Sequence, residues 1–159
     1  MKKKFSTIAI ICVLIAGLSL LLYPTISDYI NSLHQSRAVA DYVDAVNHLD
    51  DDTYEELWNN AVEYNKKLLQ KNNRYKMTAA ERADYEAQLD VTGIGIMGYV
   101  DIPSIKCTLP IYHGTDDAVL QTAVGHIDIS SLPVGGKSTH CVISGHRGLP
   151  SARLFTDLD

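Results

Sequence analysis

The sequence predicts an α+β protein in which a membrane helix and a helical region precede a region of short strands. Three observations support this class. An uncharged apolar run lies near the N-terminus, and apolar residues recur every three or four positions in the middle of the chain. Residues 93–159 hold nine of the ten glycines and four of the five prolines. We therefore divide the 159 residues into segments 1–23, 24–92 and 93–159.

Residues 5–22 are the predicted membrane segment. They carry no charged side chain, and a helix of these 18 residues is about 27 Å long at 1.5 Å per residue. That length nearly spans a hydrocarbon core of about 30 Å, and Tyr23 follows at an interfacial position. Residues 2–4 are all lysine. By the positive-inside rule they stay in the cytoplasm, so everything after Pro24 lies outside.

A cleavable signal peptide is the alternative for this segment. Its apolar region would be about 7–15 residues long and would end at a small-x-small site. The run here is longer, and LLLYP at 20–24 offers no such site. We therefore predict an uncleaved, single-pass signal-anchor in the cell membrane. The rest of the chain is extracytoplasmic under either interpretation.

Composition excludes several classes of protein. Hydrophobic residues make up 46% and charged residues 21%, which excludes a disordered chain. Three cysteines are too few for a disulfide scaffold. The net charge is −5 and no basic stripe follows residue 4, which argues against a nucleic-acid partner. The acidity belongs to the middle of the chain, because residues 23–92 carry a net charge of −6 and residues 93–159 only −2.

The helical region has apolar residues on one helix face as far as the run of aspartates at 50–52. Thr53 and Glu56 fit a capping box, which predicts that a second helix begins there. Its apolar face comprises Leu57, Ala61, Tyr64 and Leu68. We interpret this region as a stalk or spacer whose acidic faces are solvated surface.

A break at Asn72 and Asn73 ends the second helix. Thr78 and Glu81 form another capping box, which predicts a short third helix that ends near Leu89.

From Gly93 the pattern changes to strands and turns. It predicts strands over 98–103 and 105–112, the second with alternating apolar residues, and a helical stretch over 118–124. Residues 138–144 read as a buried strand that ends at Gly145. Repeated short strands with Gly and Pro turns favour a β-barrel or sandwich.

Four histidines lie in the strand region, and His146 is the one whose setting suggests chemistry. The spacing of His113, His126, His140 and His146 contains no HxH, HxxxH or CxxC pair, so we expect no metal. His146 follows a strand between Gly145 and Arg147, where a rigid strand end can present a functional side chain. A turn histidine with one local hydrogen bond is the alternative.

The cysteines do not complete a catalytic dyad with His146. If 141–146 is one strand, Cys141 and His146 point to opposite faces and lie about 16 Å apart. Cys141 is then strand core, and Cys107, which alternates with apolar neighbours, is buried as well. Whether these two pair or stay free is left open. Cys12 lies in the apolar run and is interpreted as a small hydrophobe.

The motifs SGHRGLPSA at 144–152 and LPIYHGT at 109–115 together resemble class C sortases, the pilus-assembling transpeptidases of Gram-positive bacteria. Further matching stretches lie at 23–31, 41–50, 61–68, 93–108 and 123–140, and the first motif continues to residue 159. The resemblance implies an N-terminal anchor and an eight-stranded β-barrel. It also implies a Cys thiolate that attacks the Thr–Gly bond of an LPXTG-like sorting signal, after which a lysine of the next pilin subunit resolves the thioacyl enzyme into an isopeptide bond. The partners would be pilin subunits and the membrane, with no cofactor.

The resemblance assigns roles residue by residue. The family's catalytic histidine maps onto His146, as proton donor and acceptor. His126 maps onto a motif position that is not catalytic, and a structural role is favoured. The nucleophilic Cys and the catalytic Arg are absent from this chain, so we expect an incomplete barrel and a fragment that is inactive alone.

The resemblance also implies a lid, the segment that covers the active site in pilus-type sortases. It should lie within about 71–88, but its Asp-Pro-aromatic motif is missing, and Tyr75 is the candidate aromatic. The alternative function is a membrane-anchored binding or structural module that keeps part of a sortase barrel without chemistry.

Overall fold

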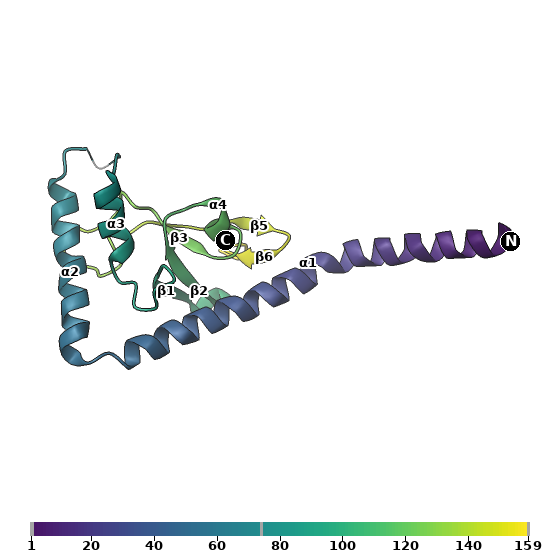
Figure 1. The fold of residues 1–159 in the computed structure, drawn as a ribbon, viewed down its shortest axis with the longest axis horizontal. Helices are drawn as coiled ribbons and strands as arrows, with labels where there is room; N and C mark the ends of the chain where they lie inside the picture. Colours follow the sequence, from purple (N-terminus) through teal and green to yellow (C-terminus); the bar gives the residue numbers. More distant parts are fainter. Residues whose placement is uncertain (1, 74, 159) are drawn as a thin grey trace.

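The computed structural model describes residues 2–73 and 75–158. Three longer helices precede two small sheets (Figure 1). The helices are α1 (Lys2–Asn47), α2 (Asp51–Gln70) and α3 (Ala79–Ala87), with a one-turn α4 (Asp117–Leu120) and a 3-10 turn (Pro103–Ile105) further on. The strands are β1 (Ile96–Ile102), β2 (Cys107–His113), β3 (Val124–His126), β4 (Ile143–Ser144), β5 (Arg147–Leu149) and β6 (Ala152–Leu154).

Helix α1 joins the predicted anchor and the start of the helical region into one continuous helix. It runs through Pro24 without a break, and its N-terminal half extends away from the rest of the molecule (Figure 1). The helix is long and apolar enough to span a membrane. Its C-terminal half lies along the strands. The predicted membrane segment and the strand region are therefore joined by one continuous helix.

The start of α2 corrects one sequence-based prediction. Asp50 is the N-cap, and its carboxylate accepts hydrogen bonds from the backbone N–H of Thr53 at 2.8 Å and from the Thr53 hydroxyl at 3.1 Å. The predicted capping box of Thr53 and Glu56 is wrong, because the carboxylate of Asp50 already caps the helix three residues earlier. Its negative charge also interacts favourably with the positive end of the helix dipole.

The second predicted capping box is confirmed. Thr78 Oγ1 accepts from the N–H of Glu81 at 3.3 Å, and the Glu81 carboxylate accepts from the N–H of Thr78 at 2.7 Å. The third helix then ends at Ala87, close to the predicted end near Leu89.

The larger sheet has the strand order β1-β2-β3-β4. Strands β1 and β2 are antiparallel, β2 and β3 are parallel and joined through α4, and β3 and β4 are antiparallel. Strands β5 and β6 form a separate antiparallel hairpin. The strands predicted at 98–103 and 105–112 are confirmed within a few residues, and the predicted helical stretch at 118–124 is shorter and begins one residue earlier.

The buried strand predicted for 138–144 is largely wrong. Only Ile143 and Ser144 pair with β3, and Cys141 is exposed. The short length of β3 explains the difference, because a three-residue strand offers a partner to only a few residues. The premise that 141–146 is one strand therefore fails, and with it the placement of Cys141 in the core.

The core lies where α2 and α3 pack against the larger sheet. Its main cluster comprises Ala61, Tyr64, Leu68, Tyr85, Met97, Ile111, Leu132 and Val134. A second cluster joins that sheet to the β5–β6 hairpin through Leu109, Val124, Ala152 and Leu154. The interpretation of the helical region as a spacer is therefore wrong for α2 and α3, which supply half of the main core.

The close approach of β3 to the turn after β2 yields a stability prediction. A Cβ at Gly125 would collide with the backbone carbonyl of Gly114, which cannot move aside as a side chain could. We expect Gly125→Ala to lower the free energy of unfolding by about 3 kcal/mol or more, measured by denaturant unfolding. Gly98→Ala is the control, because a Cβ there has no atom within 4 Å. Equal stabilities of the two variants would contradict this packing.

Candidate functional site

His146 lies in the connection between β4 and β5, and its side chain is exposed. The backbone on either side of it is fixed. A Cβ at Gly145 would lie 2.9 Å from two ring carbons of Phe155, so the ring packs directly on the glycine. The N–H of Phe155 donates to the carbonyl of His146 at 3.2 Å. The imidazole of His146 is thus accessible, while its backbone is held by Phe155. This agrees with the prediction from its position at a strand end beside Gly145.

The β5–β6 hairpin that follows His146 is tied together by its own polar groups. The N–H of Gly148 donates to the Thr156 hydroxyl at 3.0 Å, and that hydroxyl donates to the carbonyl of Arg153. The Arg153 guanidinium contacts both oxygens of Asp157, at 2.7 and 2.8 Å. These bonds fix the hairpin that carries the sequence Arg147 to Leu154.

Helix α1 holds this hairpin through two hydrogen bonds. The N–H of Arg153 donates to Asp28 at 2.7 Å, and the Asn31 amide donates to the carbonyl of Ser151 at 2.7 Å. Both bonds lie within nine residues of the apolar run at 5–22. The flank of His146 is therefore held by the same helix that carries the predicted membrane segment.

His126 is buried and fully hydrogen-bonded, in agreement with the structural role favoured for it. Its Nδ1 accepts from the Tyr85 hydroxyl at 2.9 Å, and its Nε2 donates to the carbonyl of Ser131 at 2.9 Å. The Tyr85 oxygen also accepts from the N–H of Gly114 at 3.0 Å. Burial lowers the pKa of His126 and raises that of the Tyr85 phenol, so both groups are neutral at pH 7.

The other histidines do not join His146. The two ring nitrogens of His113 lie 2.8 and 3.0 Å from the carbonyl oxygens of Gln88 and Gly95, and its ring meets that of Tyr85 edge-on at 5.0 Å. His34, His48 and His140 are exposed. Over residues 2–73 and 75–158, no group of three or more His, Cys, Asp or Glu side chains is placed to hold a metal.

The cysteines are free thiols and not a disulfide. Cys107 is half-buried and its Sγ donates to the carbonyl of Leu154 at 3.5 Å. Burial, with added repulsion from Asp157 and Asp101, raises the pKa of this thiol. A catalytic thiolate requires the opposite shift, so Cys107 is not in the environment of an activated nucleophile.

The candidate lid residue Tyr75 is 79% exposed in the connection between α2 and α3. The Lys71 ammonium contacts Glu81 at 2.7 Å and the carbonyl of Lys76 at 3.1 Å, which links the residue after α2 to the start of α3. The same ammonium and the Thr78 cap lower the pKa of Glu81 to about 2. In Figure 1, α2 and α3 lie on the opposite side of β3 from β5 and β6.

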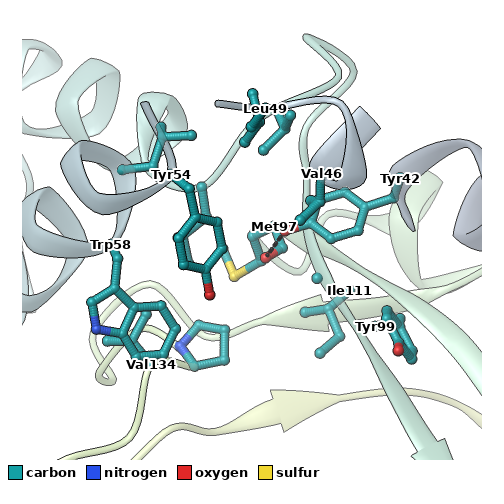
Figure 2. Close-up of a pocket in the computed structure, with 14 residues that line it drawn as sticks. Tyr42, Val46, Leu49, Tyr54, Trp58, Met97, Tyr99, Ile111 and Val134 are labelled. Atoms are coloured by element: carbon teal, nitrogen blue, oxygen red, sulfur yellow. Dashed lines mark hydrogen bonds between the residues drawn. The ribbon is translucent and has the colours of Figure 1, made fainter. Parts of the chain in front are cut away.

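An apolar pocket of about 260 Å³ lies between the end of α1, the start of α2 and β1 (Figure 2). The Tyr42 hydroxyl donates to the carbonyl of Met97 at 3.1 Å at its edge, and the rings of Tyr54 and Trp58 stack along one wall. No carboxylate or imidazole lines it. The pocket can accept apolar groups. Sequence reasoning missed it because its walls come from distant segments.

The strand region of this chain matches a known protein family. The family model of the sortase domain matches residues 100–159. None of the curated proteins matches the chain.

Solved structures match over most of the chain. Sortase C1 from Streptococcus agalactiae is 52% identical over 77% of this chain and 63% of its own, with a TM-score of 0.73. Sortase C from Streptococcus pneumoniae is 35% identical over 77% and 61%, with a TM-score of 0.64. A lid mutant of sortase A from Corynebacterium diphtheriae is 35% identical over 69% and 59%, with a TM-score of 0.60. The chain therefore spans about three-fifths of the length of these structures.

The neutral, buried state of His126 makes stability depend on pH. Its pKa in the folded protein is lowered from the ordinary value of 6.5, so the unfolded chain binds the proton more readily. Stability should fall as the pH drops through about 6.5. We expect the melting temperature to decrease from pH 7.5 to pH 5, and His126→Gln to flatten that decrease. His34→Gln, at an exposed site, should leave it unchanged. Identical pH slopes for wild type and His126→Gln would refute the assignment.

Proposed function

The chain belongs to the sortase family, and from that premise we propose that it is the N-terminal part of a class C sortase. In this proposal the complete protein is a cysteine transpeptidase that cleaves LPXTG-like sorting signals and joins pilin subunits through lysine isopeptide bonds. The observation that carries the proposal is the exposed His146 on its fixed backbone, inside a motif shared with the family.

His146 acts in both halves of the proposed reaction. When the nucleophilic thiolate attacks the carbonyl carbon of the Thr–Gly bond, the imidazolium of His146 protonates the departing glycine amine. The neutral imidazole then takes a proton from the incoming pilin lysine as its amine attacks the thioester, and the thiolate is released. Exposure of the side chain supports this role, because both amines must approach the ring from outside.

The nucleophile is proposed to be none of the three cysteines in this sequence. Cys12 lies in the apolar half of α1, Cys107 has a raised pKa and bonds to Leu154, and Cys141 lies outside the strands. We propose that the catalytic Cys and Arg belong to further strands of the barrel, outside residues 1–159. The present fragment would then be inactive by itself.

The proposed location is the cell membrane, with α1 as a single-pass anchor and residues 24–159 extracytoplasmic. The apolar N-terminal half of α1 and the lysines before it support this orientation. A lid within 71–88 is also proposed. The exposed Tyr75 is its candidate aromatic residue.

The test uses the complete protein with a sorting-signal peptide and a pilin that offers the acceptor lysine. We expect His146→Ala to slow transpeptidation by about 10²–10⁴-fold, because general acid–base assistance is lost. The melting temperature should not change, since the side chain is exposed.

His34→Ala is the matched control, and its rate should equal that of wild type. Wild-type activity in His146→Ala would sink the assignment. Peptide binding without turnover by the wild-type protein would favour a non-catalytic binding module instead.

A further inference from the structure

Helix α1 exposes an apolar face that continues beyond the predicted membrane segment. Ile26, Tyr29, Ile30 and Leu33 are each between 47% and 64% exposed. At 100° per residue they lie on the same side of the helix as Ile15, Leu18 and Leu22 of the membrane segment. A single shallow groove runs across the boundary, lined by residues from Ile15 to Ile30. The apolar face is therefore continuous from the membrane segment outward.

The opposite side of the same helix holds the strand region. Asp28 and Asn31 bond to the β5–β6 hairpin, Gln35 donates to the carbonyl of Thr122 at 2.6 Å, and Tyr42 donates to that of Met97 at 3.1 Å. These residues lie roughly 140–200° around the helix from Ile26. The described part of the fold thus uses one side of α1 and leaves the apolar side uncovered.

The length and charge of α1 identify what covers that side. From Phe5 to Leu33 the helix is about 43 Å long, which exceeds a hydrocarbon core of about 30 Å but matches a whole bilayer of about 40–45 Å with its headgroups. Between Lys4 and Arg37 the only charged residue is Asp28, and its carboxylate is turned to the hairpin. Tyr23 and Tyr29 are residue types that settle at the membrane interface.

We propose that the outer leaflet of the membrane covers the face of α1 formed by Tyr23, Ile26, Tyr29, Ile30 and Leu33, with the headgroup layer reaching Leu33. Because Asp28 and Asn31 lie at that depth on the other side, the β5–β6 hairpin sits at the level of the lipid headgroups. Its turn points along α1 toward the N-terminus (Figure 1). His146, just before β5, is thereby held close to the membrane surface. The inference rests on the proposed anchor, and its test separates the two.

The test measures the depth of single tryptophans in bilayers. Ile15→Trp, Leu33→Trp and Arg37→Trp are made separately in the complete protein, in a background where Trp58 and every other tryptophan are replaced by phenylalanine. All three positions lie on the same helix face, and Arg37 is one turn beyond Leu33. Each variant is reconstituted into phosphatidylcholine–phosphatidylglycerol vesicles with and without brominated acyl chains. We expect strong quenching at 15, measurable quenching at 33 and none at 37, with acrylamide quenching in the reverse order.

Three results would overturn the inference. A tryptophan at 33 that acrylamide quenches as fully as the one at 37 means that water covers this face. A tryptophan at 33 that neither quencher reaches means that protein covers it, such as a second copy of the chain. Loss of quenching at 15 as well would refute the anchor itself. Circular dichroism of each variant confirms that the helix is intact.

Discussion

The hydroxyl of Tyr85 is the interaction on which the rest of the structure depends. It comes from the short helix α3, and it satisfies the N–H of Gly114 after β2 and Nδ1 of His126 at the end of β3. Its ring packs between those of Tyr64 and His113. Without this phenol the buried Nδ1 of His126 and the partly buried N–H of Gly114 would lose a partner, and leaving a buried group unsatisfied costs about 1–3 kcal/mol. The bond therefore makes the helical region and the larger sheet one folded unit.

A second support acts from the other side. Helix α1 bonds to the β5–β6 hairpin through Asp28 and Asn31, while Phe155 ties that hairpin to the backbone of His146. Tyr85 fixes β3, and β3 pairs with β4, which leads into His146. The candidate catalytic residue thus sits between helix α1 and a buried hydrogen-bond network, and its imidazole is exposed.

Sequence patterns predicted the features that depend on interactions between residues close together in the chain. The Thr78 cap, the first two strands and the setting of His146 beside Gly145 follow from residues that are neighbours in the chain. The Tyr85–His126 bond joins residues 41 positions apart, so no spacing rule could reveal it. Cys141 illustrates the same limit: its apolar surroundings suggested a strand, but the length of β3 decides how far pairing extends. The resemblance to a known family assigned His146, whereas the periodicity of the sequence could not.

The free energy of unfolding of Tyr85→Phe tests this central coupling most directly. The substitution keeps the ring contacts and removes only the hydroxyl, so we expect a loss of about 2–4 kcal/mol, together with faster amide exchange at Gly114. Tyr75→Phe, at an exposed site, should change nothing. A Tyr85→Phe protein as stable as Tyr75→Phe would contradict the claim that this one hydroxyl joins the helical region to the strands that carry His146.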